Sequence, residues 1–199
     1  TRYPPEWIHD PESADPKMEL SRVPLHTTWE AMEAEVTKGK TRYIGVCNYN
    51  SGLINDLLSY CRIKAAVVQI ESHPYLTQER MLKLCAQNDI KVTAFSPLGA
   101  LSYLELDMAQ QHESVLQQPV VLAAAEAHQK TPAQIVLRWG IQRGTAIIPK
   151  TTKVARMHEN LAIFDFALSE AEMQALSDLN MDRRFNDPGH FCLDAFNTL

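Results

Sequence analysis

The run Ala65-Ala66-Val67-Val68-Gln69-Ile70 is one of four short apolar segments that decide the fold of this chain. Its apolar residues are continuous rather than alternating, which is typical of a strand buried on both faces of a parallel sheet. The other three segments are residues 43–47, 91–95 and 146–148. We predict that all four are strands.

Amphipathic helical patterns separate and follow these segments. The predicted helices cover residues 28–39, 53–58, 78–85, 120–128, 132–143, 154–161 and 169–179. Thr28, Thr77 and Ser169 are the candidate N-caps, because a side-chain hydroxyl can accept a free N–H of the first turn. Pro132 follows Thr131 at a favoured first-turn position. Glu172 follows Ser169 at the spacing of a capping box.

Alternating strands and helices predict an α/β fold with a parallel sheet of βα units. Four strands fit either a doubly wound sheet or part of an eight-stranded barrel. The sequence has no G-x-G-x-x-G motif, which argues against a Rossmann dinucleotide site. In a barrel, chemistry gathers just past the carboxyl ends of the strands.

Composition bounds the class of protein. The chain has 199 residues, of which 45% are hydrophobic and 22% charged, and its formal net charge is -5. An acidic chain argues against a nucleic-acid partner. No apolar run is long enough for a membrane span, and no signal peptide is visible. The four cysteines have no C-x-x-C spacing, so we expect neither a zinc nor a redox site, and a reduced, cytoplasmic protein.

The segment 146–151 ends one predicted strand with Pro149, Lys150 and Thr151, and Arg156 follows in the next helix. A lysine point charge and the planar donor fork of an arginine both suit a phosphate. The N–H groups of a helix N-terminus would add to the attraction. The segment therefore predicts an anion site, and a surface loop with solvated charges is the alternative.

Polar and aromatic side chains stand at the ends of the other strands. Asn48 follows the first strand, Gln69 and Glu71 end the second, and Phe95 and Ser96 end the third. Amides, an aromatic ring, a hydroxyl and a cation at one edge suit one large polar ligand with a flat ring.

These strand ends resemble those of the aldo-keto reductases, TIM barrels that use a nicotinamide cofactor. The matching motifs are Ile44-Gly45-Val46-Cys47-Asn48-Tyr49, residues 69–76, residues 94–99, and residues 148–151 with Arg156, Glu159 and Asn160. The match covers nearly the whole chain. It implies a single domain over residues 1–199 that is the C-terminal half of a (β/α)8 barrel, without the N-terminal half.

Within the family the resemblance is greatest to xylose reductases and other aldose reductase-like members. Residues 3–5, 102–105 and 184–188 carry this finer similarity. It implies reduction of aldehydes and aldoses, such as xylose, to alcohols. A small carbonyl compound is then the expected substrate.

The resemblance implies a role for each strand end. Asn48 and Gln69 would hydrogen-bond the nicotinamide carboxamide, since amides offer matched donors and acceptors. Phe95 would stack on the nicotinamide ring, where many family members have tyrosine. The residues expected along the pyrophosphate are Ser96, Leu98 and Gly99.

The same resemblance implies which residues contact each part of the adenosine end of the cofactor. Lys150, Thr151 and Arg156 would hold the 2′-phosphate of NADPH, and Thr151 stands where the family usually has serine. Glu159 and Asn160 would contact the adenine side. A glutamate at position 105 meets the ribose hydroxyls in xylose reductases, so Glu105 makes NADH possible as well as NADPH. A solvated acid in a loop is the alternative for Glu105.

Asn186 falls in the C-terminal loop that shapes the family's substrate pocket, and Trp7 and Cys192 are further candidates there. His73 belongs to a structural turn by the same comparison. The family's catalytic tyrosine, lysine, aspartate and histidine lie in the first half of the barrel, and none of them can be placed in this sequence. A general acid is therefore expected from outside the chain.

Two hypotheses follow from the missing half. The chain is either part of a complete reductase or a catalytically inactive cofactor-binding or structural remnant. Half a barrel would expose sheet edges and apolar surface, which predicts pairing with the missing half or with a partner chain.

Overall fold

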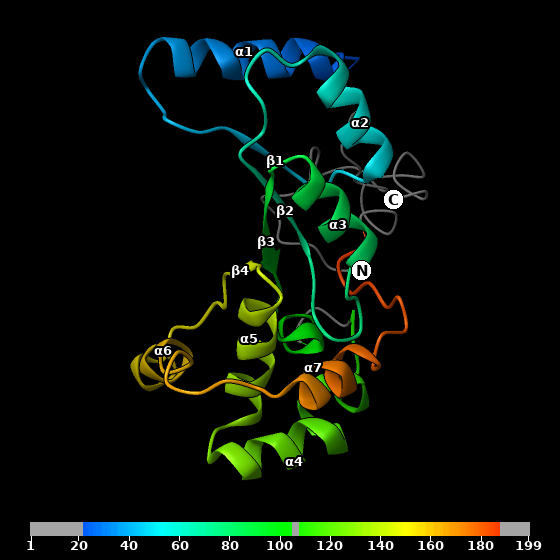
Figure 1. Ribbon diagram of the computed structural model, residues 1–199, viewed down its shortest axis with the longest axis vertical. Helices are drawn as coiled ribbons and strands as arrows, with labels where there is room; N and C mark the ends of the chain where they lie inside the picture. The colour runs from blue at the N-terminus through cyan, green and yellow to red at the C-terminus, as the bar shows by residue number, and fades with distance from the viewer. Residues whose placement is uncertain (1–21, 105–107, 188–199) are drawn as a thin grey trace, which may run out of the picture.

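Four parallel strands form one sheet in the order β1-β2-β3-β4. The computed structural model describes residues 22–104 and 108–187 (Figure 1). The strands are β1 (Gly45–Cys47), β2 (Val67–Glu71), β3 (Lys91–Phe95) and β4 (Ala146–Ile147). All four predicted strands are confirmed.

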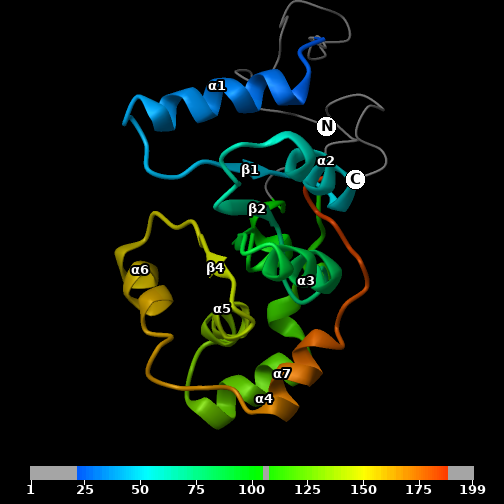
Figure 2. The same cartoon turned by 45° about the horizontal axis from the view of Figure 1, so that its top comes forward.

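Helices connect and follow these strands. They are α1 (Leu25–Thr37), α2 (Ser51–Tyr60), α3 (Glu79–Gln87), α4 (Pro119–His128), α5 (Pro132–Gln142), α6 (Val154–Leu161) and α7 (Glu170–Ser177). Three short 3₁₀ helices, η2 (Gly99–Ser102), η3 (Gln111–Glu113) and η4 (Val115–Gln117), fill the long connection between β3 and α4. α1 and α2 lie near one end of the molecule and α4, α5 and α7 near the other, with α6 to one side (Figures 1 and 2).

The strand register decides which side chains share a face. Cys47 aligns with Gln69, and Gln69 aligns with Thr93. Because side chains alternate along a strand, these three point to the same face of the sheet, and Val68 and Val92 point to the other. Cys47 is exposed and Gln69 and Thr93 are half-buried, whereas Val68 and Val92 are buried.

Helices α2 and α3 cover the buried face. Ile54 of α2 and Met81 and Cys85 of α3 pack with Val68 and Val92 in one apolar cluster. A larger cluster joins α4, α5 and α7 around the buried Trp139, whose indole N–H donates to Ser177 Oγ at 3.1 Å. The open face is therefore the one that carries Gln69.

Helix α1 is fastened by the buried carboxylate of Glu33. Glu33 Oε1 accepts the backbone N–H groups of Arg62 and Ile63, at 2.7 and 2.8 Å. Its second oxygen, Oε2, accepts Arg62 Nε–H at 2.8 Å. These contacts tie α1 to the segment between α2 and β2.

One of the predicted N-caps is confirmed and two are wrong. Ser169 forms a capping box, as expected, and Pro132 begins α5 after Thr131, which also forms a capping box. Thr28 was a wrong prediction, because α1 begins at Leu25 and the Pro24 carbonyl accepts its first hydrogen bonds. Thr77 was also wrong: Gln78 precedes α3, while the Thr77 N–H donates to Asn180 Oδ1 and its carbonyl accepts from Arg143.

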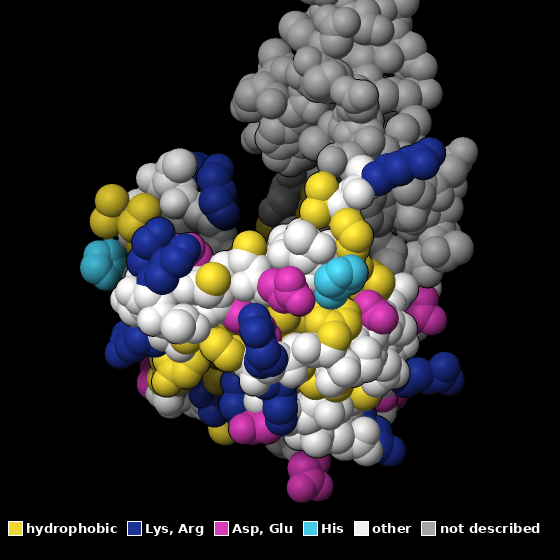
Figure 3. All heavy atoms as spheres, turned by 90° about the horizontal axis from the view of Figure 1, so that it is seen from above, with side chains coloured by type: hydrophobic (Ala, Val, Ile, Leu, Met, Phe, Trp, Pro, Cys, Tyr) yellow, Lys and Arg dark blue, Asp and Glu magenta, His cyan; other side chains and the backbone are white. Residues whose placement is uncertain are grey.

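Charged side chains of both signs are interspersed with hydrophobic ones on the face shown in Figure 3. Within residues 22–104 and 108–187, no helix combines the length and apolar character needed to cross a bilayer.

Replacing Gly45 with alanine tests the close approach of β1 and β2. A Cβ atom there would lie 2.4 Å from the Val67 carbonyl oxygen and 2.5 Å from Val67 Cγ1, so the strands would have to separate. We expect Gly45→Ala to lower the free energy of unfolding by about 3 kcal/mol in urea denaturation.

Gly39→Ala is the matched control, because Gly39 has a φ of +72° but nothing within 4 Å of an added Cβ. It should cost about 1 kcal/mol through backbone strain alone. Equal losses for the two variants would contradict the steric account of Gly45.

Glu33 predicts a dependence of stability on pH. Burial alone would raise the pKa of Glu33, but the N–H groups of Ile63 and Arg62 and the Arg62 guanidinium hold it below its usual value of 4.5. A group with a lowered pKa in the folded protein stabilises it above the unfolded pKa, and the benefit is lost as pH falls through the lowered value.

Unfolding midpoints of wild type and Glu33→Gln should therefore differ most at pH 7 and converge below pH 4.5. A gap that stays constant from pH 7 to pH 3 would show that the carboxylate charge is not what fastens α1.

Candidate functional site

The carboxyl ends of β1 and β2 bring Asn48 and Gln69 to one edge of the sheet. Asn48 follows β1 directly, in the left-handed conformation with φ of 56°, and its N–H donates to the Gln69 carbonyl at 2.9 Å. Asn48 is exposed and Gln69 half-buried. The two amides that the sequence predicted as partners are thus neighbours, with their side chains accessible.

The end of β3 forms a tight turn. Phe95 aligns with Glu71 of β2 and is half-buried. Ser96 has a φ of 48°, and its carbonyl accepts the N–H of Gly99, whose own φ is 66°. Such backbone angles favour glycine, which explains Gly99 at this position. The Leu98 side chain is half-buried against the cluster around Trp139. Because this side chain packs into the protein, a ligand at this edge would contact the backbone of the turn instead.

Glu71, at the end of β2, is the most connected side chain of this edge. It is fully buried, and its carboxylate accepts the N–H groups of Phe185 at 2.8 Å and Asn186 at 3.0 Å. His73 Nε2 lies 2.9 Å from the same carboxylate. A buried charge is tolerated when hydrogen bonds satisfy it. Glu71 therefore fastens the C-terminal segment to the end of β2.

Tyr103 links the turn after β3 with that segment. Its hydroxyl lies 2.7 Å from Ser96 Oγ and close to the Asn186 side chain. Its ring stacks on Phe185, with centroids 5.9 Å apart and planes 16° apart. Ser96 and Asn186, predicted for cofactor and substrate respectively, therefore both lie beside one hydroxyl.

Lys150 and Arg156 follow β4, with a third cation, Lys153, between them. Lys150 and Arg156 are exposed, and among the residues that the structure describes neither has an ion pair with an acid. Lys153, at the N-cap of α6, makes no side-chain cap, and Thr151 Oγ1 accepts the Lys153 N–H at 3.2 Å. Free cations beside a helix N-terminus can attract an anion.

Glu159 and Asn160 lie in the last turn of α6. The Glu159 carboxylate accepts the Thr131 hydroxyl, and its carbonyl accepts Gln134 Nε2–H at 3.0 Å. The Glu159 side chain therefore holds α6 against the start of α5 in this structure. Asn160 is half-buried.

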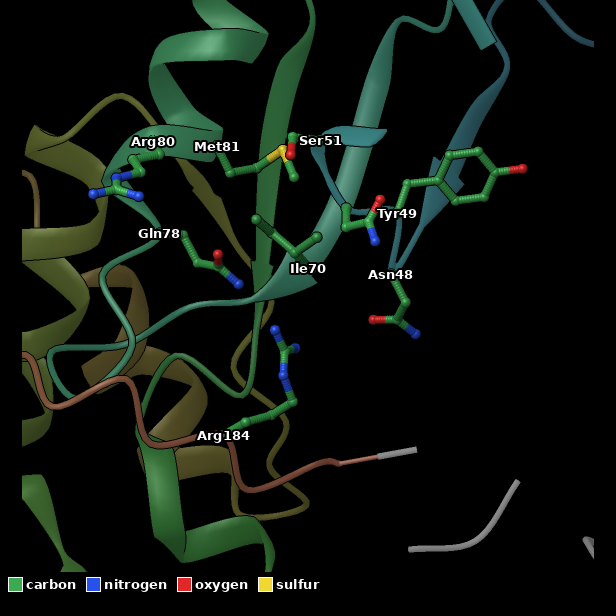
Figure 4. A pocket seen from close by; sticks show the side chains of 9 residues that line it. Asn48, Tyr49, Ser51, Ile70, Gln78, Arg80, Met81 and Arg184 are labelled. Atoms are coloured by element: carbon green, nitrogen blue, oxygen red, sulfur yellow. The ribbon is translucent and has the colours of Figure 1, made fainter. Parts of the chain in front are cut away.

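A cavity of about 210 Å³ adjoins Asn48 (Figure 4). Its lining residues are Asn48, Tyr49, Asn50, Ser51, Ile70, Gln78, Arg80, Met81 and Arg184. Gln78 and Arg184 point toward the space beside Ile70, whereas the ring of Tyr49 points away. Polar side chains from distant segments thus converge at the end of β2.

Four described tyrosines have shifted pKa values, and none is shifted in the direction that a general acid needs. Burial raises the pKa of Tyr49, Tyr60 and Tyr75, and raises that of Tyr103 to about 12. A general acid works best with a pKa near the operating pH. The described part of the chain also has no group of three or more His, Cys, Asp or Glu residues placed to hold a metal ion.

Some residues of the edge were not predicted. Glu71, Tyr103, Gln78 and Arg184 had no assigned role, although a glutamate directly after an apolar strand is a sign of a buried carboxylate that needs partners. His73 is buried in the turn where it was expected to be structural. Predictions for Glu105, Trp7 and Cys192 lie outside the described residues.

Comparison with known proteins fits this geometry. The model of the aldo/keto reductase family matches residues 7–181. A probable NAD(P)H-dependent D-xylose reductase of Emericella nidulans is 46% identical over 194 residues, covering 96% of this chain and 60% of that protein. The protein of the same name from Aspergillus clavatus is 44% identical over 189 residues, covering 94% of this chain and 56% of its own length.

A solved structure agrees with these relatives. The aldose reductase from Schistosoma japonicum superposes with a TM-score of 0.80 at 34% identity, covering 90% of this chain and 55% of that protein. The chain thus spans 55–60% of the length of these relatives. With a family model matched over most of its residues, the chain belongs to the aldo/keto reductase family.

Proposed function

We propose that this chain is the C-terminal, cofactor-binding half of a reductase barrel, a single domain completed by an N-terminal half. The complete barrel reduces aldehydes and aldoses, such as xylose, to alcohols with NADPH. The observation that carries this proposal is the order of side chains along one edge: amides at β1 and β2, an aromatic ring and a hydroxyl at β3, and the cations Lys150 and Arg156 after β4.

That order matches the order of groups in a dinucleotide. Three steps between neighbouring strands span about 14 Å, so a ligand that meets both ends of this edge is extended rather than compact. Asn48 and Gln69 orient the carboxamide, and Phe95 offers a ring face worth about 0.5–1.5 kcal/mol in stacking. The turn of Ser96 and Gly99 brings backbone close to the pyrophosphate, and Leu98 lies within it.

The cations after β4 fit the 2′-phosphate that distinguishes NADPH from NADH. Lys150 and Arg156 are exposed and free of acidic partners among the described residues, and Thr151 adds a hydroxyl. Glu159 and Asn160 face the adenine side in this proposal, and Glu105 would admit NADH through the ribose hydroxyls. NADPH, when bound, supplies the hydride for the carbonyl carbon.

The acid that protonates the product is proposed to lie in the N-terminal half. Burial raises the pKa of Tyr103 to about 12 and also raises those of Tyr49, Tyr60 and Tyr75, the opposite of what an acid at neutral pH requires. Asn186, held by Glu71, is the chain's proposed contribution to the carbonyl pocket. The relatives described above bear reductase names, which gives an inactive remnant no support.

A cytoplasmic location belongs to the same proposal. Cys47, Cys61 and Cys85 are free thiols, as a reducing compartment would keep them. The substrate is a small carbonyl compound, and the partner is the other half of the barrel.

Removing either cation tests the phosphate assignment. Lys150→Met or Arg156→Leu should raise the Kd for NADPH about 10- to 100-fold, because each removes a charge-assisted hydrogen bond. The Kd for NADH should change little, since NADH has no 2′-phosphate. Quenching of tryptophan fluorescence during titration measures both constants.

Lys91→Met is the control, because Lys91 is an exposed lysine at the amino end of β3, away from the proposed site. It should leave both Kd values unchanged. Equal weakening of NADPH and NADH binding by Lys150→Met would contradict the assignment.

Mass and turnover together test the half-barrel proposal. The protein isolated from its source should have about one and a half times the mass of this chain, as a full barrel with insertions requires. It should oxidise NADPH when xylose or glyceraldehyde is added. A mass of 22.5 kDa without turnover would instead favour the remnant.

A further inference from the structure

The backbone of Asn186 is held in place independently of its side chain. Its N–H and that of Phe185 both donate to the buried Glu71 carboxylate. Upstream, the N–H groups of Met181 and Arg183 donate to the Tyr75 carbonyl at 3.3 and 3.0 Å. The segment 181–186 is therefore held by four backbone N–H groups, two at Tyr75 in the turn after β2 and two at Glu71 at the end of β2.

The ring of Tyr103 is fixed as firmly. It is 6% exposed and stacks on Phe185, which is 2% exposed. An added Cβ at Gly99 would lie 3.5 Å from the Phe185 ring, so the turn after β3 packs directly on the same ring. The packed ring holds the Tyr103 hydroxyl at Ser96 Oγ, with the Asn186 side chain close by.

The donors and acceptors of these three side chains define which group donates to which. An amide NH₂ group of Asn186 can donate to the Tyr103 oxygen, and the tyrosine O–H can then donate to Ser96 Oγ at 2.7 Å. Burial raises the pKa of Tyr103 to about 12, so the hydroxyl keeps its proton at neutral pH. The serine O–H is left free to donate to an anionic oxygen.

We propose that Tyr103 is a positioning residue of the reductase site, whose hydroxyl joins the turn that carries Ser96 to the segment that carries Asn186. Dinucleotide binding at Ser96 and carbonyl binding at Asn186 are then coupled through one side chain. The role of Tyr103 in catalysis rests on the proposed function, whereas the link between the two segments does not.

Tyr103→Phe removes the hydroxyl and keeps the stacked ring. In the cofactor-free full-length protein, we expect amide hydrogen exchange to rise about fivefold in both residues 96–99 and residues 183–187, because one buried hydrogen bond is lost to each segment. This comparison needs no cofactor.

The functional test is a double-mutant cycle on NADPH binding. Asn186→Ala should weaken NADPH binding about fivefold in the wild-type background and have no further effect in Tyr103→Phe. Tyr103→Phe should also raise KM for xylose while kcat stays within about twofold, as loss of positioning rather than of chemistry predicts.

Tyr75→Phe is the matched control. Tyr75 is buried, and its hydroxyl accepts Gln118 Nε2–H at 2.6 Å, whereas the Tyr75 carbonyl that holds Met181 and Arg183 is unchanged in Tyr75→Phe. It should lower stability to a similar extent while leaving exchange in the two segments and the Kd for NADPH unchanged.

Faster exchange confined to residues around Tyr103, or effects of Asn186→Ala that are equal in both backgrounds, would overturn the positioning role. A wild-type protein that binds no NADPH would instead overturn the proposed function, whatever the exchange comparison shows about the link.

Discussion

The buried carboxylate of Glu71 is the interaction on which the functional edge depends. It ends β2, has no exposed surface, and accepts two backbone N–H groups from a segment 114 and 115 residues further along the chain. An unpaired charge at that position would cost several kcal/mol. Phe185 and Asn186 supply the donors. If the C-terminal segment left the end of β2, the Glu71 carboxylate would lose both hydrogen bonds and the structure would be destabilised by that amount.

Strand register places everything else relative to Glu71. Gly45 lets β1 approach β2 closely, and the alignment of Glu71 with Phe95 brings the turn of β3 to the same edge. The two remaining features, the cations after β4, follow from the strand order alone. A linear series of polar groups results, and the parallel arrangement explains why residues from four separate segments lie along one edge of the sheet.

Local patterns predicted much of this architecture, and long-range contacts account for what they missed. Apolar runs located all four strands, Pro132 marked the start of α5, and the capping-box spacing after Ser169 located the start of α7. Thr77 looked like a cap, but contacts with the distant Asn180 and Arg143 hold its backbone. The same holds for the candidate site. Its strand-end residues could be predicted from local sequence, whereas the contact of the Tyr103 hydroxyl with Ser96 is visible only in the folded structure.

A crystal structure of the full-length protein with NADPH tests the central claim most directly. The account predicts the nicotinamide ring on Phe95 with its carboxamide at Asn48 and Gln69, and the 2′-phosphate between Lys150 and Arg156. The dinucleotide would then run along the edge from β1 to β4. A cofactor bound at the amino ends of the strands, or one whose 2′-phosphate contacts neither cation, would contradict it.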